Sequence, residues 1–244
     1  MLFIAVGMPR AGSGWHYNLI HDLVVASGGT DARTIRKRFL LAPILTEVNC
    51  NIGAMNPHRL LPVMVPAVFG SRFVIKAHSR PTDIVRRFIE GGTIRATYIY
   101  RDPRAALLSA YDYGKHGLEN GIPNAFSNLD TIEKAVEFIK KYVYQREDWI
   151  RIPEVLHTRY EDFLSDYDAE VARILELLEI KSETSAVLAA VAKYRPGQQA
   201  EGQHLGLHYY KGQPERFRTA LTPEQLAYCN EVLGPSIEKM GYTL

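Results

Sequence analysis

The chain has 244 residues, of which 46% are hydrophobic and 23% are charged, close to the composition of an ordinary globular protein. This length suffices for one hydrophobic core and is tight for two full domains, and no apolar run approaches the ~18 residues of a membrane span. The formal net charge of +2 is too small to argue by itself for a nucleic-acid partner.

The two cysteines, Cys50 and Cys229, lie far apart and form no metal-type spacing. They fit unpaired thiols in a reducing compartment better than a disulfide framework. The N-terminal apolar run is too short for a signal peptide and has no basic lead. We therefore expect a cytoplasmic protein with one domain over residues 1–244 and no metal site.

The chain opens with a strand-like run, Leu2–Val6, that leads into a glycine-rich turn, Gly7–Gly14. A helical pattern then runs from Trp15 to Ser27. A strand, a glycine turn and a helix in this order point backbone N–H groups and the positive end of a helix dipole at an anion. The segment therefore predicts a phosphate-binding loop, although a merely tight turn remains an alternative.

The cation of this loop is not where a nucleotide triphosphatase has it. Gly7 and Gly12 have the right separation, but Ser13 and Gly14 follow where Lys-Ser or Lys-Thr is expected. The single cation, Arg10, lies between the glycines. The loop therefore predicts binding of a phosphate-like group without the usual ATP machinery.

Beyond the loop, strand and helix patterns alternate. We expect further strands at Arg72–Ala77, Ile94–Tyr100 and Val155–Arg159. Residues 28–70 are irregular with short helices, and 194–221 form a long loop. This alternation predicts a three-layer α/β/α fold with a central parallel sheet. The expected helices are Pro81–Glu90, Pro103–Tyr113, Leu129–Trp149, Asp168–Leu178, Ser182–Lys193, Pro223–Leu233 and Pro235–Met240.

Ligands of such sheets bind at the carboxyl ends of the strands, and one candidate pair follows the third expected strand. Arg101 comes directly after that strand, and Ser109 lies about two turns into the next helix. An arginine and a hydroxyl there could bracket a second phosphate. An arginine at a strand end is, however, more often part of a surface ion pair.

Other candidates follow the second and fourth expected strands. Lys76 and His78 close the second strand, Tyr160 follows the fourth, and Lys211 and Gly212 lie in the late loop. A lone histidine is usually structural, and the chain has eight histidines. His78 stands out because it adjoins a lysine and two expected anion sites.

Taken together, these segments resemble the sulfotransferases that use 3′-phosphoadenosine-5′-phosphosulfate (PAPS). Pro9–Trp15 is similar to their 5′-phosphosulfate loop, PKSGTTW, with arginine for lysine. Tyr100–Tyr111 resembles their 3′-phosphate motif, RNPKDxxxSxY, with the same arginine-to-serine spacing. Lys76–His78 resembles their Lys-Thr-His, Tyr160–Phe163 their YEDL-type segment, and Lys211–Gly212 the end of their RKGxxGxWK loop.

The resemblance implies a single α/β domain with a five-stranded parallel sheet, related to the P-loop nucleotide kinases. It implies that the loop holds the 5′-phosphosulfate, that Trp15 packs against adenine and that the Tyr160 segment supports the adenine side. It further implies that Arg101 and Ser109 bind the 3′-phosphate, assisted by the late loop. The donor-binding residues so implied are Arg10, Ala11, Gly12, Ser13, Gly14, Trp15, Arg101, Ser109, Tyr160, Lys211 and Gly212.

The resemblance also implies the catalytic roles. His78 takes the proton from the acceptor, and Lys76 lies near the transferring sulfuryl group. Arg10 stabilises the charge that develops on the leaving phosphate, as preorganised cations do in group transfer. No metal is required.

The sequence departs from the family at several positions. Tyr210 stands where arginine is usual, Phe217 where tryptophan is usual, and Asp102 replaces asparagine. Arg216 and Arg218 are candidates to compensate in the late loop. The adenine-contacting threonine, expected near residues 182–194, has no clear counterpart.

We therefore expect a PAPS-dependent sulfotransferase that acts on a hydroxyl, or an amine, of a small-molecule or glycan acceptor and releases the desulfated product PAP. A nucleotide-dependent kinase of related fold and a non-catalytic nucleotide-binding protein remain alternatives. Acceptor specificity is expected from residues 28–70, 112–128 and 194–210.

Overall fold

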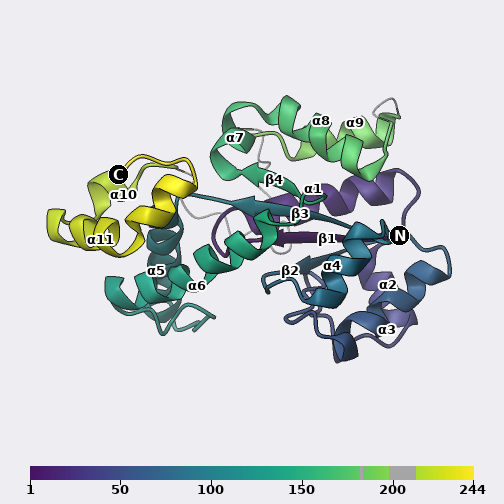
Figure 1. The fold of residues 1–244 in the computed structure, drawn as a ribbon, viewed down its shortest axis with the longest axis horizontal. Coiled ribbons are helices and arrows are strands. Elements are labelled where there is room, and N and C mark those ends of the chain that lie inside the picture. Colours follow the sequence, from purple (N-terminus) through teal and green to yellow (C-terminus); the bar gives the residue numbers. More distant parts are fainter. Residues whose placement is uncertain (182–183, 198–212) are drawn as a thin grey trace.

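The structure is a computed structural model that describes residues 1–181, 184–197 and 213–244. These residues form one parallel sheet in the order β2-β1-β3-β4 (Figure 1). The strands that they contain are β1 (Leu2–Gly7), β2 (Phe73–Ala77), β3 (Ile94–Tyr100) and β4 (Leu156–Arg159). The resemblance implied five strands, and the described part of the chain forms four.

Helices connect the strands and complete the chain. They are α1 (Ser13–Ala26), α2 (Ala32–Arg38), α3 (Pro57–Val68), α4 (Asp83–Glu90), α5 (Pro103–Glu119), α6 (Ile132–Ile150), α7 (Tyr160–Ser165), α8 (Tyr167–Leu178), α9 (Ser185–Lys193), α10 (Phe217–Ala220) and α11 (Pro223–Lys239). No helix in the described ranges is long and apolar enough to cross a membrane.

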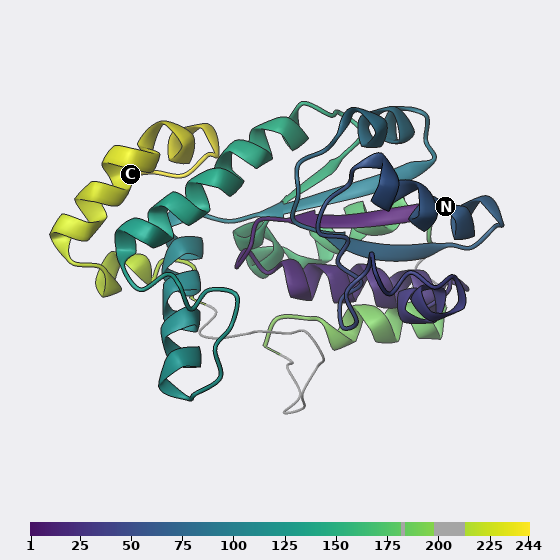
Figure 2. The same cartoon turned by 90° about the horizontal axis from the view of Figure 1, so that it is seen from below.

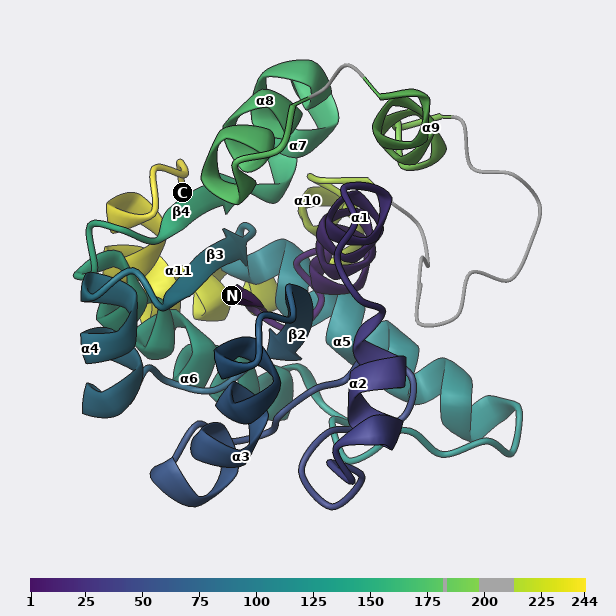
Figure 3. The same cartoon turned by 90° about the vertical axis from the view of Figure 1, so that its right-hand side faces the viewer.

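The sheet separates two hydrophobic cores, because side chains alternate between its faces. Leu2 and Ile4 of β1 belong to one core, together with side chains of α3, α4, α5, α6 and α11. Phe3 and Ala5 belong to the other core, together with side chains of α1, α8 and α9. Helices therefore cover both faces, as Figures 2 and 3 show, and the predicted three-layer α/β/α fold is confirmed.

The strand order brings the ends of the strands to one edge. Val6 of β1 pairs with Ala77 of β2, and Gly7 pairs with Ile99 of β3. The chain moves from β1 to one side and then crosses to the other side at β3, so a topological switch point lies between β1 and β3. Ligands of open α/β sheets bind in the crevice at such a point.

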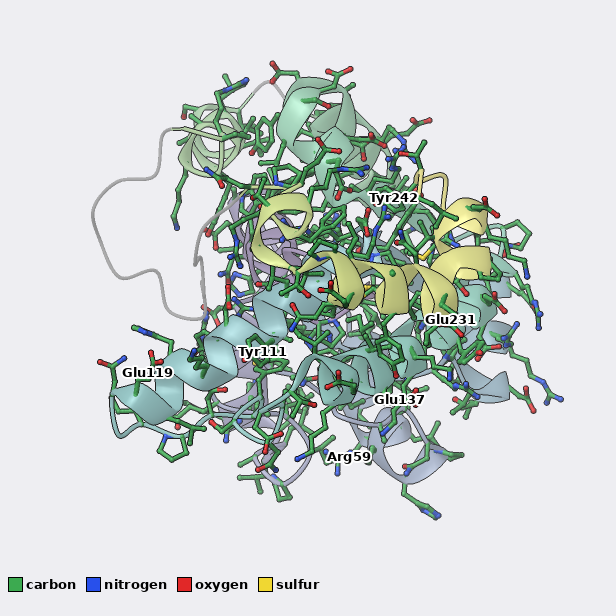
Figure 4. The ribbon with its side chains drawn as sticks, turned by 90° about the vertical axis from the view of Figure 1, so that its left-hand side faces the viewer. Arg59, Tyr111, Glu119, Glu137, Glu231 and Tyr242 are labelled. Atoms are coloured by element: carbon green, nitrogen blue, oxygen red, sulfur yellow. The ribbon has the colours of Figure 1, made fainter. Side chains whose placement is uncertain are left out.

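Helix α5 is six residues longer than the sequence indicated. It was expected to end at Tyr113, before a glycine-rich stretch, but it continues to Glu119 (Figure 4). Gly114 lies inside it, and a Cβ there would be 2.1 Å from the carbonyl oxygen of Phe126. The glycine therefore lets the returning chain pack against the helix and does not end it.

The two helices expected at the C-terminus are one. Helix α11 runs through Pro235 to Lys239, although proline lacks an N–H and crowds the carbonyl four residues earlier. Leu233 and Ile237 on either side of Pro235 are fully buried. α11 packs against α5 and α6 (Figure 4), and we attribute the continuity of the helix to this burial.

Candidate active site

The loop after β1 has the conformation that an anion site needs. Met8 N donates to Ile99 O across 3.0 Å, which anchors the loop to β3. Arg10 and Gly12 both have left-handed backbones, with φ of 63° and 78°. Helix α1 begins at Ser13, two residues earlier than predicted, and the first N–H groups of a helix have no partner within it. The N–H groups of this first turn are therefore available to an oxyanion.

Gly12 is required by space as well as by its backbone angle. A Cβ at Gly12 would lie 2.7 Å from Cδ2 of Tyr160. Tyr160 is the first residue of α7, and the Arg101 guanidinium lies 4.5 Å from the centre of its ring. The loop, the ring of Tyr160 and Arg101 are therefore packed in succession.

We expect Gly12→Ala to lower the free energy of unfolding by more than about 2 kcal/mol, because a left-handed alanine costs about 1–2 kcal/mol and the ring of Tyr160 must move. Urea denaturation measures this change. Gly28→Ala is the matched control: Gly28 has φ of 87°, and a Cβ added there would meet no atom within 4 Å. Equal losses in the two variants would show that contact with Tyr160 does not matter.

Arg10 projects from the loop towards α5. Its Nε donates to Ser109 Oγ across 3.1 Å, and its guanidinium lies 4.4 Å from the ring centre of Tyr113. Burial is the main cause that lowers the pKa of Arg10, to about 10, and nearby Arg101 acts in the same direction. Arg10 therefore stays charged at neutral pH. The structure brings Ser109, predicted for the 3′-phosphate site, into contact with the cation of the 5′ loop.

His78 is held in the orientation of a base. Its Nδ1 is 2.6 Å from the carbonyl oxygen of Gly7, which can only accept, so Nδ1 carries the proton and Nε2 keeps a free lone pair. Burial, and then Lys76, lowers the pKa of His78 to about 3, so the imidazole is neutral at pH 7. The next residue, Ser79, accepts from Trp149 Nε1 across 3.0 Å, which ties the turn to α6.

Lys76 lies at the end of β2 on the sheet face that α1 covers. Val74 belongs to the core on that face, and strand alternation places Lys76 on the same side. Burial, and then Arg10, lowers the pKa of Lys76 to about 8. Among the described residues, no side chain or carbonyl accepts a hydrogen bond from its ammonium group.

The sequence analysis missed His16, a residue of α1 that lies close to Lys76. It is fully buried, and neither ring nitrogen has a hydrogen-bond partner among the described residues. Burial, and then Lys76, lowers the pKa of His16 to about 3. Its position directly after Trp15 in the loop-to-helix motif was the only signal that could have found it.

Arg101 lies at the end of β3, as predicted, and is 7% exposed. Its Nη2 donates to Gln213 O across 2.9 Å, and its Nε is buried without a partner among the described residues. Burial lowers its pKa. Gln213 directly follows Lys211 and Gly212, which lie outside the described residues together with Tyr210.

Trp15 lies in an aromatic cluster on the α1 side of the sheet. Its ring centre is 4.5 Å from that of Phe163, edge to face, and 6.2 Å from that of Tyr167, stacked in parallel. Its Nε1 donates to Tyr194 O across 2.9 Å. Packing and this hydrogen bond fix the indole, which remains half-buried and could offer a surface to a base.

Two neighbouring residues of the Arg101 segment have structural roles. Asp102 caps α5 through the N–H of Arg104 across 2.8 Å, and its carboxylate pairs with the Arg104 guanidinium at 2.8 Å. Arg104 is fully buried, and it also donates to Asn230 across 3.0 Å and to Thr243 O across 2.5 Å. The pair joins α5 to α11 and the C-terminus.

The late-loop arginines pair with carboxylates. Arg216 pairs with Asp112 of α5, and Arg218 pairs with Glu215 at 3.2 Å. Phe217 is buried with its ring 4.5 Å from the Arg104 guanidinium. These contacts give the arginines local partners, so compensation for Tyr210 at a phosphate would require them to exchange these partners.

Comparisons with known proteins identify the family of the chain. The family model described as the sulfotransferase domain matches residues 3–243, and the chain therefore belongs to the sulfotransferase family. No curated protein matches the chain.

Solved structures share the fold at low sequence identity. Mouse sulfotransferase SULT7A1 complexed with PAP superimposes with a TM-score of 0.60 at 15% identity, over 97% of this chain and 84% of that one. Retinol dehydratase in complex with androsterone and the inactive cofactor PAP has a TM-score of 0.57 at 16% identity, over 97% and 80%. A putative steroid sulphotransferase from Arabidopsis thaliana has a TM-score of 0.50 at 18% identity, over 100% and 78%.

Proposed function

We propose that the chain transfers the sulfuryl group of PAPS to a hydroxyl, or an amine, of a small-molecule or glycan acceptor. One observation carries this proposal: His78 contacts Gly7 at the end of β1, and His78, Lys76, Arg10 and Arg101 lie close enough in succession to affect one another electrostatically. Within the sulfotransferase family, such a set supports a negatively charged donor and an acceptor that must lose a proton.

The residues present fit a donor with two anionic groups. The first-turn N–H groups of α1 suit the 5′-phosphosulfate. Arg101 offers a buried Nε that has no partner in the described part of the chain, which suits the 3′-phosphate. PAPS, when bound, supplies an activated sulfuryl group. Trp15 and Tyr160 would lie on its adenine side, and Lys211 and Gly212 stay predictions for the 3′-phosphate.

The positions of the side chains support the following roles in the transfer. His78 accepts the acceptor's proton at Nε2 while the acceptor oxygen bonds to sulfur and the bond from sulfur to the 5′-phosphate oxygen breaks. Arg10 stabilises the negative charge that develops on that phosphate oxygen. Lys76 is buried, and Arg10 lies close enough to lower the pKa of Lys76. This position suits a cation near the transferring group.

The acceptor is proposed only by class. Half-buried aromatic side chains of α5, α6 and the 120–128 segment, among them Tyr111, Phe126 and Phe138, suit a largely apolar small molecule. Retinol dehydratase, which shares the fold, has been crystallised with androsterone and with retinol. We further propose a single domain over residues 1–244 in the cytoplasm, which agrees with two buried free cysteines, Cys50 and Cys229.

We expect saturating PAP to raise the melting temperature by roughly 5–10 °C. A ligand at about 100 times its Kd stabilises the native state by about 2.7 kcal/mol, and about 1 kcal/mol shifts Tm by about 2–4 °C at this chain length. Differential scanning fluorimetry with PAP, adenosine 5′-monophosphate and ATP with magnesium measures the shift.

The Arg101→Met variant is the control for the 3′-phosphate. It should lose most of the difference between PAP and adenosine 5′-monophosphate, because the 3′-phosphate distinguishes the two ligands. Stabilisation by ATP with magnesium, together with no response to millimolar PAP, would contradict the proposal and favour the kinase alternative.

A further inference from the structure

The Arg10 guanidinium is enclosed by two aromatic rings that the transfer chemistry does not use. Its central carbon lies 4.4 Å from the ring centre of Tyr113 and 5.8 Å from that of Phe126. Both distances are within the range in which a cation is attracted to the face of a ring. We call Tyr113 and Phe126 the aromatic cage of Arg10.

Helix α5 contributes one side of this cage. Ser109 and Tyr113 are four residues apart, so they lie on the same face of the helix, one turn from each other. Ser109 Oγ accepts from Arg10 Nε at 3.1 Å, while the ring of Tyr113 contacts the guanidinium. One helix face therefore holds Arg10 at two points.

The segment after α5 contributes the other side. Asn124 donates from Nδ2 to Tyr113 O across 2.8 Å, and its Oδ1 accepts from Phe126 N across 2.9 Å. Phe126 therefore returns to the ring of Tyr113, with ring centres 5.9 Å apart and edge to face. Gly114 permits this approach, because a side chain there would collide with the Phe126 carbonyl. The ring centre of Phe138 of α6 lies 5.6 Å from that of Phe126, edge to face.

The surroundings of Arg10 explain why a cage matters. Arg101 and Lys76 are cations near enough that Arg10 lies within a cluster of like charge. Repulsion within this cluster makes the charged guanidinium less stable at this position. The ring faces attract the guanidinium without adding the negative charge that a carboxylate would, so they leave the anion site positive.

We propose that Tyr113 and Phe126 are positioning residues that fix the Arg10 guanidinium beside α5, in one place within the anion site, before the donor arrives. This inference rests on the proposed function, because it assigns Arg10 to the 5′-phosphate of the donor. A preorganised cation loses less side-chain freedom when it binds, so the cage raises donor affinity.

The experiment compares Tyr113→Leu, Tyr113→Phe and Phe126→Leu with the wild type by calorimetric titration with PAP in the absence of acceptor. Phe138→Leu is the matched control, because it removes the aromatic ring next to Phe126, and the ring of Phe138 makes no described contact with Arg10. Each variant is also combined with Arg10→Met. Melting temperatures without ligand report folding.

We expect Tyr113→Leu to weaken PAP binding by about 3- to 30-fold, which corresponds to the loss of a partly buried cation–π contact. Phe126→Leu should have a smaller effect, because its ring is farther from Arg10. Tyr113→Phe keeps the ring and should bind within about twofold of the wild type, as should Phe138→Leu. In the Arg10→Met background, Tyr113→Leu should change affinity by less than about twofold, because the coupled partner is gone.

Three outcomes would overturn the cage. Wild-type affinity for PAP in Tyr113→Leu with only acceptor KM changed would make Tyr113 an acceptor contact. An undiminished Tyr113→Leu effect in the Arg10→Met background would make its role structural. If Tyr113→Leu does not fold, equal PAP affinities of Phe126→Leu and Phe138→Leu decide against the cage. Failure of the wild type to bind PAP would instead contradict the proposed function.

Discussion

The His78→Ala variant should turn over PAPS about 10²–10⁴-fold more slowly than the wild type, with its affinity for PAP nearly unchanged. The reason is geometric: Nδ1 donates to Gly7 O at 2.6 Å, so Nε2 offers the lone pair that accepts the acceptor's proton. A steady-state assay with PAPS and an acceptor that the wild type sulfates measures kcat, and calorimetry measures PAP binding.

His78→Asn is the informative control. The asparagine amide nitrogen can still donate to Gly7 O, but the side chain has no group at the position of Nε2. We expect this variant to be as slow as His78→Ala. Turnover near the wild-type rate in His78→Asn would instead show that His78 only supports the loop. Such a result would favour a non-catalytic role for His78.

The Arg104→Met variant should lose about 3–5 kcal/mol of unfolding free energy, because removal of one partner leaves the other charge buried. Asp102 would keep its position at the α5 N-terminus without its cation, and Asn230 and Thr243 O would lose their donor. Urea denaturation with a shared m-value measures the loss.

Arg218→Met is the matched comparison for this prediction. Arg218 is exposed and pairs with Glu215 at 3.2 Å, and exposed pairs contribute only about 0–1 kcal/mol. Losses of similar size in the two variants would contradict a stabilising role for the Asp102–Arg104 pair. PAP affinity should change little in Arg104→Met if the fold is retained, because Arg104 is turned towards α11.

Most of the fold could be predicted, because strand and helix patterns are local. The run from Leu2, the turn to Gly14 and the alternation that follows predicted the parallel sheet and its covering helices. Where these local patterns gave a wrong helix boundary, the cause lies in the tertiary structure. Pro235 predicts the end of a helix, yet α11 continues past it, and Leu233 and Ile237 on either side are buried. The short helix α7, which begins at Tyr160, was not predicted at all.

The candidate site could be predicted in part. Arg10, His78 and Arg101 follow strands, and parallel strands end at one edge, so their neighbourhood followed from chain order alone. His16 was missed, because a histidine inside a helical pattern is usually one more buried side chain. Arg101 and Arg104 look alike in the sequence, but Arg101 packs on the ring of Tyr160 and Arg104 pairs with Asp102.

The sequence by itself determined the anion-binding turn, the strand ends and the residue types at them, because backbone conformation follows from neighbours along the chain. Only the tertiary structure decided which side chains meet. Arg10 contacts Ser109, 99 residues away, and Tyr113 beside it. Such contacts depend on strand order, on the angle of α5 and on the Asn124 turn that returns Phe126. All three depend on packing over the whole molecule, and a local sequence pattern does not predict them.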